Sequence, residues 1–325
     1  MGQTFEDFEI NVSDNASTDG TEQICRAYDQ QDSRVRYSRN EKNLGIMRNF
    51  NGLFQRQNSG YFKWAAADDV YAPDYLLRTV EVLDHDPSTV LVSARQRLID
   101  QDGTLLTFDE GSTTLVTSYG EVVRHVNTRS DFSSPEPHTR FRAVVMHQRS
   151  RIHEAHVYGL IRSAALGQTA LYDRYVGSEK VYTAHLSLLG RFHEVPKELF
   201  TWRLHPERVG KLKPADQTRV FDPEWSGRFV FMGAKHIAGY LRAIRAAPLS
   251  GPEKALCTMV VLEKIPRGAA EQAKGRLRNA TQGKAQIHSF AEALNGPRQR
   301  AAAWTCLSFR HLEPMTSSSS GGFRC

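Results

Sequence analysis

Cysteine is scarce in this chain of 325 residues, and the four that occur stand far apart in the sequence. They are Cys25, Cys257, Cys306 and Cys325. Because no two of them form a C-x-x-C pair, the sequence predicts neither a zinc ribbon nor a disulfide framework. The pattern agrees with a protein of the reducing cytosol.

Long apolar runs are missing as well. No stretch approaches the roughly 20 apolar residues of a membrane-spanning helix, so we do not expect an integral membrane protein. Residues Met1–Glu6 lack the basic and then apolar start of a secretory signal, and we therefore expect a cytoplasmic location. Hydrophobic residues still make up 40% of the chain, which is enough for a sizeable core and excludes a disordered or fibrous protein.

Charge is distributed unevenly along the chain. Residues 1–110 contain 11 Lys/Arg and 19 Asp/Glu, whereas residues 111–325 contain 31 and 17, so the net charges are −8 and +14. An acidic first part suits cation binding, and a basic second part suits a phosphate-bearing ligand, nucleic acid or an anionic membrane face. The alternative is that the excess of Lys and Arg in residues 111–325 only forms a solvated basic surface. No nucleic-acid-binding motif is present, so we expect no nucleic-acid partner and keep peripheral contact with the inner membrane face as an expectation.

The first part of the chain alternates between strand and helix patterns. Helix patterns lie at 22–30, where Ile24 and Tyr28 share one face, and at 46–57 and 73–83. The intervening strand patterns lie at 8–13, 35–37, 61–67 and 90–99. This order predicts an α/β fold with a mostly parallel, doubly wound sheet. Ligands bind such sheets at the carboxyl ends of the strands.

Acidic residues follow two of these strand patterns. Asp14 ends the first strand, and the pair Asp68 and Asp69 ends the apolar strand at 61–67, so we expect both on the same rim of the sheet. Two adjacent carboxylates repel each other and persist most easily where a cation lies between them and a polyanion, as Mg²⁺ or Mn²⁺ does with phosphate. The alternative is a solvated turn in which an Asp caps the next helix.

The residues after Asp14 are typical of a helix start. Ser17, Thr18 and Asp19 are expected to cap the helix, which would leave Asp14 free to accept hydrogen bonds from a base or ribose. Arg48 would be the phosphate partner, because a guanidinium grips phosphate oxygens bidentately. A turn carboxylate and a surface arginine are the structural alternatives.

Taken together, the motifs resemble family two glycosyltransferases of the GT-A fold. The first half carries QTF at 3–5, FEI at 8–10, SDNASTDGT at 13–21, NLG at 43–45, RN at 48–49, ADD at 67–69 and PDYL at 73–76. The second half carries GSEK at 177–180, GRF at 190–192, VP at 195–196, LF at 199–200, Arg203 and HP at 205–206. Each motif is short, and their joint order over residues 3–210 gives the resemblance its specificity.

The resemblance implies roles for individual donor-site residues. Asp14 matches the aspartate that contacts the nucleotide base, and Arg48 matches an arginine near the nucleotide. Asp68 would contact the ribose side, and Asp69 would hold Mn²⁺ or Mg²⁺. His205 matches a position where some members place a histidine near the metal or the diphosphate.

Glu179 matches the acidic position that serves as general base in inverting members of the family. The resemblance thus implies transfer of a sugar from a nucleoside-diphosphate donor to the hydroxyl of a glycan or lipid-linked acceptor, in cell-envelope polysaccharide synthesis. A carboxylate can accept the hydroxyl proton, while a metal neutralises the leaving diphosphate. Glu179 lies in the first turn of a helix pattern that Ser178 caps, where the helix dipole favours the ionised carboxylate.

On this basis we expect four regions. Residues 1–110 would form the nucleotide-sugar-binding half and residues 111–222 the acceptor-binding and catalytic half. Residues 223–316 would form a helical, basic extension, with 15 Lys/Arg against 6 Asp/Glu in residues 224–325. Residues 317–325, rich in Ser and Gly, would be a disordered tail.

Two departures from the family pattern leave a second hypothesis open. Ala66 stands where the family's acidic motif has another aspartate, two positions before Asp68. The chain also begins without the first strand and helix that the family places about thirty residues ahead of the QTF motif. A catalytically impaired nucleotide-sugar-binding protein of the same fold is therefore the alternative.

Overall fold

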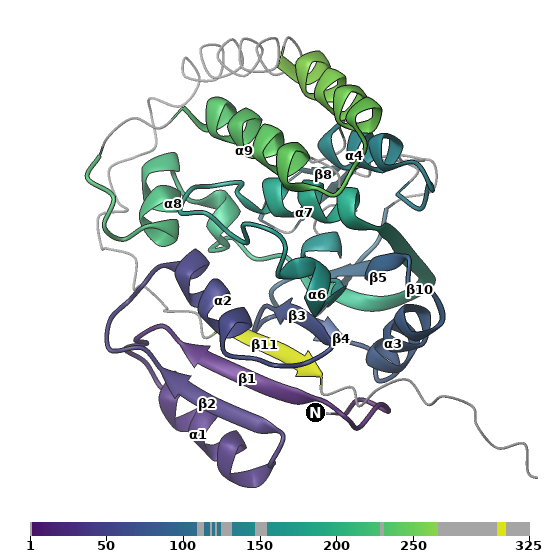
Figure 1. Cartoon of the computed structure of the whole chain (residues 1–325). Coiled ribbons are helices and arrows are strands. Elements are labelled where there is room, and N and C mark those ends of the chain that lie inside the picture. The colour runs from purple at the N-terminus through teal and green to yellow at the C-terminus, as the bar shows by residue number, and fades with distance from the viewer. Residues whose placement is uncertain are drawn as a thin grey trace, which may run out of the picture.

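A mixed β-sheet runs through the middle of the computed structural model, with helices packed against it (Figure 1). The structure describes residues 2–108, 114–117, 119–120, 122–124, 132–146, 155–227, 231–265 and 304–309. The predicted tail at 317–325 lies outside the described residues, and so does much of the predicted extension.

The sheet has nine strands, eight of them in the order β2-β1-β11-β3-β9-β5-β10-β4, and β6 pairs with β5. Their bounds are β1 Glu9–Asp14, β2 Val35–Arg39, β3 Tyr61–Ala65, β4 Val70–Tyr71, β5 Thr89–Ile99, β6 Leu105–Leu106, β9 Leu160–Arg162, β10 Arg191–Arg203 and β11 Trp304–Phe309. A separate antiparallel pair consists of β7, Thr114–Val116, and β8, Val122–Arg124.

The predicted α/β class is confirmed, and the predicted parallel character holds in part. β1 pairs with β2 in parallel, and β5 pairs with β10 in parallel. Among the described residues, the other pairings of the main sheet are antiparallel, including both pairings of β9. The apolar runs that form β9 and β11 are short, and periodicity alone does not identify runs of this length as strands.

Strand β11 lies between β1 and β3 and runs antiparallel to both. It comes from the C-terminal region, for which the sequence predicted helices. That predicted extension, residues 223–316, does contain α9, Met232–Ala246, and a helix over residues 251–265, and α8, Pro214–Phe221, directly precedes it. The segment that fills the centre of the sheet beside β1 therefore comes from the far end of the chain (Figure 1).

The remaining helices connect the strands and cover the sheet. They are α1 Thr21–Gln31, α2 Ile46–Gln55, α3 Tyr75–His85, α4 Pro137–Met146, α6 Ser163–Leu166, α7 Glu179–Leu189 and the 3₁₀ turn η1 Val209–Lys211. The predicted helix is present as α1, and its apolar residues Ile24 and Tyr28 are 61% and 50% exposed. Within the described chain, no helix is long and apolar enough to cross a membrane.

The side chains of β3 alternate between two hydrophobic cores. Phe62 and Trp64 enter the larger core, which is formed with α2, α4, α7 and α9. Tyr61 points to the opposite core, which is formed with α3. This period-two alternation is typical of a strand that is buried on both faces. The burial holds β3 in place, and Asp68 and Asp69 follow three residues after its end.

Candidate functional site

The strand register places Asp14 and the Asp68–Asp69 pair on one rim of the sheet. Val12 of β1 and Ala65 of β3 both lie opposite Thr305 of β11, on its two sides. The two strands run in the same direction, and each leads within three residues into its acidic segment. The predicted common rim is therefore present, although β11 separates β1 from β3.

Asp69 has one satisfied and one unsatisfied carboxylate oxygen. Its Oδ1 accepts a hydrogen bond from the main-chain N–H of Arg203 over 3.1 Å. Its Oδ2 is buried and has no hydrogen-bond partner among the described residues. Burial and then the neighbouring charge of Asp68 raise the pKa of Asp69 to about 7. A buried acceptor of this kind is costly unless a proton or a cation occupies it.

His205 lies beside Asp68, the neighbour of Asp69 in the acidic pair. Its Nε2 lies 3.2 Å from Asp68 Oδ2 at the end of β10. Arg203 fixes the same turn, since its Nε donates to the carbonyl oxygen of Asp68 over 3.0 Å. Asp68 and His205 offer a carboxylate oxygen and an imidazole, which are ligand types for a divalent cation, but among the described residues the ligand atoms of Asp68, Asp69 and His205 do not all lie within 4.8 Å of one another. Ala66, buried at 8% exposure, adds no ligand.

Lys63 belongs to this site, and the sequence analysis missed it. Its side chain is fully buried on β3, with Nζ 3.6 Å from the ring centre of Tyr71 and 5.1 Å from that of Tyr75. The Lys63 charge acts to lower the pKa of Asp69, against the burial that raises it. A lysine in an otherwise apolar strand that leads into two aspartates was the available signal.

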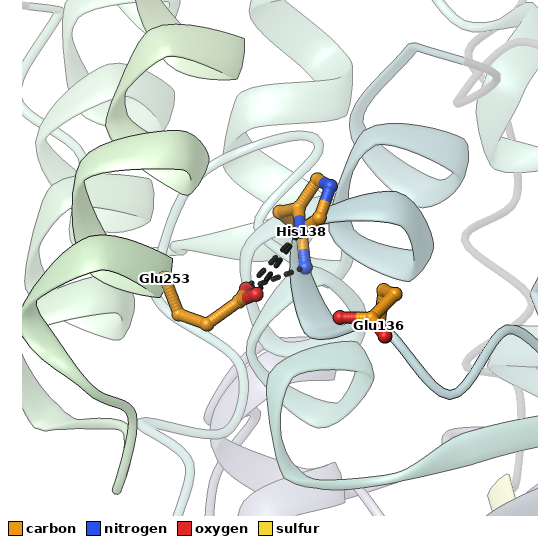
Figure 2. A group of neighbouring side chains, drawn as sticks. All are labelled: Glu136, His138 and Glu253. Atoms are coloured by element: carbon orange, nitrogen blue, oxygen red, sulfur yellow. Dashed lines mark hydrogen bonds and ion pairs between the residues drawn. The ribbon is translucent and has the colours of Figure 1, made fainter.

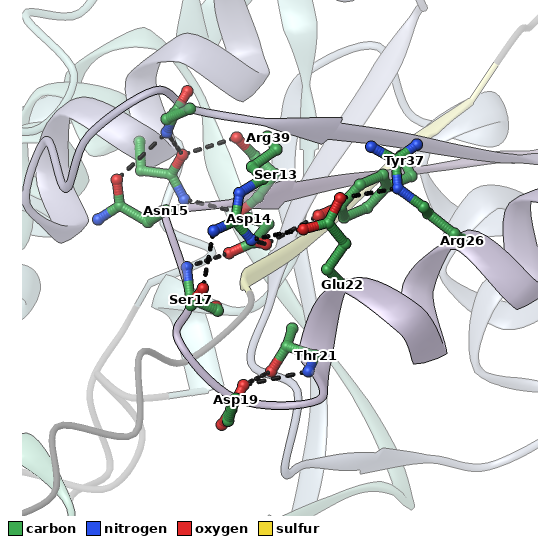
Figure 3. A network of polar contacts seen from close by, with 12 residues as sticks. Ser13, Asp14, Asn15, Ser17, Asp19, Thr21, Glu22, Arg26, Tyr37 and Arg39 are labelled. Atoms are coloured by element: carbon green, nitrogen blue, oxygen red, sulfur yellow. Dashed lines mark hydrogen bonds and ion pairs between the residues drawn. The ribbon is translucent and has the colours of Figure 1, made fainter.

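Asp14 is not free at the rim, contrary to the expectation. Its side chain is fully buried, and its carboxylate accepts hydrogen bonds from the Ser17 N–H (2.8 Å), the Tyr37 hydroxyl (2.8 Å) and Arg39 Nη1 (2.7 Å) (Figure 3). Burial acts to raise the pKa of Asp14, but these donors outweigh it and the pKa is lowered. In this state Asp14 organises the loop after β1.

Capping of α1 also differs from the prediction. Gly20 is the N-cap residue and makes no side-chain cap. Of the three expected capping residues, Asp19 accepts from the Thr21 N–H over 3.1 Å, and the Ser17 N–H is turned to Asp14 instead (Figure 3). The loop therefore curls around the Asp14 carboxylate before the helix begins.

The NLG and RN motifs hold a second loop against the end of β1. Asn15 Oδ1 accepts from the Leu44 N–H over 2.9 Å, and Asn49 Nδ2 donates to the Ser13 carbonyl over 3.0 Å. Gly45 has φ +82°, and a Cβ there would lie 2.5 Å from the Phe221 carbonyl oxygen. Only glycine fits this close approach with a left-handed backbone.

Arg48 is paired with a carboxylate from the C-terminal region. Its Nη2 lies 2.8 Å from Glu224 Oε2. The same carboxyl group also lies 3.7 Å from Lys42 and 3.4 Å from Arg174. Hydrogen bonding and charge from Arg48 lower the pKa of Glu224. Lys42, Arg48 and Arg174 therefore surround the exposed Glu224 carboxylate, and the same three cations could bind another anion in its place.

Glu179 is the first residue of α7, directly after the N-cap residue Ser178, as expected. Its side chain is half-buried. Burial raises the pKa of Glu179, although the Lys180 charge opposes the shift. The expectation that the helix start would favour the ionised form is therefore wrong in direction, because desolvation outweighs the dipole.

A further group that could bind metal lies away from this rim. The ligand atoms of Glu136, His138 and Glu253 lie within 4.8 Å of one another (Figure 2). Glu253 accepts from the His138 N–H over 3.3 Å and lies 3.2 Å from its Nδ1. The carboxylate thus closes the N-terminus of α4, where the helix dipole favours an anion over a cation, and ties α4 to the helix over 251–265.

The sequence segment that contains these rim residues matches a known family. Residues 1–116 match the model described as glycosyl transferase family 2. This stretch contains Asp14, Arg48, Asp68 and Asp69 with their loops.

Residues 1–116 thus resemble a family 2 glycosyltransferase domain. An uncharacterized glycosyltransferase of Methanocaldococcus jannaschii is 30% identical over 105 residues, which are 32% of this chain and 36% of that protein. The abequosyltransferase RfbV of Salmonella typhimurium is 35% identical over 91 residues, 28% of this chain and 27% of that protein. The match thus spans about a third of these relatives or less.

Among solved structures, S. aureus TarS residues 1–349 in complex with UDP is 15% identical to this chain, with a TM-score of 0.43. The likeness covers 82% of this chain and 85% of that one.

Proposed function

We propose that this chain is an inverting glycosyltransferase that moves a sugar from a nucleoside-diphosphate donor to an acceptor hydroxyl. The observation that carries the proposal is the unsatisfied, buried Oδ2 of Asp69, next to Asp68 in the segment that matches the family 2 model; Asp68 in turn contacts His205. Nothing in the described surroundings of that oxygen satisfies it, so a ligand is its natural partner.

Asp69 would hold a divalent cation, Mn²⁺ or Mg²⁺, and His205 would support the same site next to Asp68. When bound, the cation neutralises charge on the leaving diphosphate. Asp68 would bind the ribose side of the donor, and Arg48 its phosphates. Arg48 can do so once its contact with Glu224 opens, because phosphate oxygens compete with a carboxylate for a guanidinium.

Glu179 would act as the general base. The acceptor oxygen forms a bond to the anomeric carbon while the bond from that carbon to the diphosphate oxygen breaks, and the hydroxyl proton moves to the Glu179 carboxylate. The raised pKa supports this role, because a carboxylate with a higher pKa is a stronger base near neutral pH.

We place the acceptor among glycans and lipid-linked sugars of cell-envelope polysaccharide synthesis. The support is the relative named abequosyltransferase and the basic charge of residues 111–325. A cytoplasmic site of action, with peripheral contact to an anionic membrane face, belongs to the same proposal.

A second candidate is a nucleotide-sugar-binding protein that does not catalyse transfer. Two observations favour it. Ala66 removes a carboxylate from the acidic motif, and the carboxylate of Asp14 is already saturated by protein donors.

Transfer from UDP-, dTDP- and GDP-sugars, measured with Mn²⁺ and a panel of glycan acceptors, tests the proposal. We expect Glu179→Gln to lower turnover by about 10²- to 10⁴-fold while nucleotide binding is retained. The control is Glu81→Gln, an exposed α3 residue paired with Arg78. Full activity of Glu179→Gln would contradict the assignment of the base, and saturable nucleotide binding without turnover by the unaltered chain would favour the second candidate.

A further inference from the structure

Two neighbouring cavities lie between α7, α9 and the segment at 168–175. They have volumes of ≈ 140 Å³ and ≈ 290 Å³ and share Ala170, Val181 and Arg242 in their walls. Tyr172, Tyr175 and Ser178 complete much of the smaller one. The wall of the smaller cavity combines apolar side chains with polar and charged groups, which could hold a polar ligand.

Ser178 is an unpartnered polar group in this wall. The residue is 1% exposed, and its Oγ has no hydrogen-bond partner among the described residues. A buried hydroxyl normally bonds to protein or to water. A ligand hydroxyl that enters the smaller cavity would supply the missing partner. The neighbouring Leu171 has φ +55°, so the cavity wall also holds a strained backbone position.

Arg242 brings a positive charge to both cavities. Within the part of the chain that the structure describes, its guanidinium has no hydrogen bond or ion pair, and its charge reaches the Tyr175 hydroxyl. About two turns earlier on α9, Lys235 places Nζ 4.8 Å from the centre of the Tyr175 ring. Asp173 also lines the smaller cavity, but its Oδ1 accepts from the Arg174 N–H over 2.7 Å.

The cavity adjoins the proposed base. Ser178 directly precedes Glu179, and the Glu179 charge acts on the hydroxyls of both Tyr172 and Tyr175 in the cavity wall. A molecule in the smaller cavity would therefore present hydroxyls close to the residue that would deprotonate one of them.

We propose that this cavity binds the acceptor and selects a carbohydrate unit that carries a phosphate. Ser178 Oγ would bond to a carbohydrate hydroxyl, and Arg242 would bind the phosphate bidentately. This inference rests on the proposed function, because it assigns the cavity to the acceptor side of that reaction. Under this proposal Arg242 determines the preference for a phosphorylated acceptor, and it lies outside the segment at 1–116 that matches the family 2 model.

Glucose 1-phosphate and methyl α-glucoside form a matched pair of probes, since they share the ring and differ in the phosphate. Binding of each to the full chain is measured by calorimetry and by saturation-transfer NMR in the absence of any nucleotide. We expect glucose 1-phosphate to bind at least tenfold more tightly. Arg242→Gln should abolish this preference, and Ser178→Ala should weaken both probes about equally.

Arg245→Gln is the matched control, because Arg245 is an exposed arginine on the same helix and lines neither cavity. Circular dichroism confirms that each variant is folded. Equal binding of the two probes, or an equal loss in Arg242→Gln and Arg245→Gln, would overturn the proposal.

Failure here is distinguishable from failure of the proposed function. The probe titrations need neither donor nor metal, whereas the transferase proposal depends on them. A chain that binds nucleotide and transfers sugar but shows no phosphate preference would refute only the acceptor inference.

Discussion

The main-chain N–H of Arg203 donates a hydrogen bond to Asp69 Oδ1 over 3.1 Å and so joins the end of β10 to the acidic turn after β3. This contact holds Asp69 in place with its other oxygen unsatisfied. The segment that matches the family 2 model ends at residue 116, so the Asp69 carboxylate is positioned by a strand outside it.

Metal binding should depend on pH through Asp69. Its pKa is raised to about 7, so the folded protein holds a proton there that a cation must displace. Without metal, this raised pKa makes folding stability fall as pH rises from about 4 to about 7, because the folded state binds the extra proton. Mn²⁺ affinity should rise roughly tenfold between pH 6 and pH 8. Calorimetric titration at the two pH values measures it.

Asp69→Asn is the variant that isolates this effect, since it keeps the shape and removes the charge. Its Mn²⁺ affinity should be low and nearly independent of pH. An unaltered chain whose Mn²⁺ affinity is the same at pH 6 and pH 8 would contradict the assignment of Asp69.

Lys63→Met should move the pH dependence of metal binding upward. The Lys63 ammonium acts to lower the pKa of Asp69, so its removal raises that pKa further. The unbranched methionine side chain fills the space beside Tyr71 and Tyr75. The pH midpoint of Mn²⁺ binding is the measurement, with exposed Lys197→Met as control. An unchanged midpoint would show that Lys63 does not act on this site.

Asp14→Asn should destabilise the protein. The carboxylate is fully buried and accepts from Ser17, Tyr37 and Arg39, and its pKa is lowered. The stabilisation is present above pH 4 and is lost as pH falls through the lowered pKa. Urea unfolding at pH 7 should show a loss of about 2–3 kcal/mol.

Asp19→Asn is the comparison, because Asp19 is an exposed residue of the same loop whose carboxylate accepts from the Thr21 N–H. It should cost less than about 1 kcal/mol. Equal losses for the two variants would argue against a special structural role for Asp14.

Glu224→Gln should strengthen nucleotide binding. Its carboxylate neutralises a group formed by Lys42, Arg48 and Arg174, so removing the charge leaves these cations available for phosphate. We expect a gain of about two- to fivefold at low ionic strength, which salt reduces. Glu194→Gln, which breaks an exposed pair with Arg95, is the control. Weaker nucleotide binding by Glu224→Gln would mean that Glu224 supports the site.

The sequence predicted the local elements of the first hundred residues well, because their strands and helices alternate and are strongly patterned. It also predicted the shared rim of Asp14 and Asp68, which follows from strand direction alone. The contact between His205 and Asp68 agrees with the resemblance, which placed both near the donor.

Other features depend on long-range contacts that no local pattern contains. The position of β11 between β1 and β3 joins residues almost 300 apart. The Asp14 carboxylate is saturated by Tyr37 and Arg39 from a neighbouring strand, and Arg48 meets Glu224 from beyond residue 220. The raised pKa of Glu179 likewise reflects tertiary burial, which the helix-start pattern could not reveal.

Calorimetric titration of UDP, dTDP and GDP, with and without Mn²⁺, tests the central claim most directly. The account predicts that at least one nucleotide binds in a Mn²⁺-dependent manner to the unaltered chain, and that Asp69→Asn loses this dependence while it remains folded. Absence of Mn²⁺-dependent nucleotide binding by the unaltered chain, or its persistence in Asp69→Asn, would contradict the account.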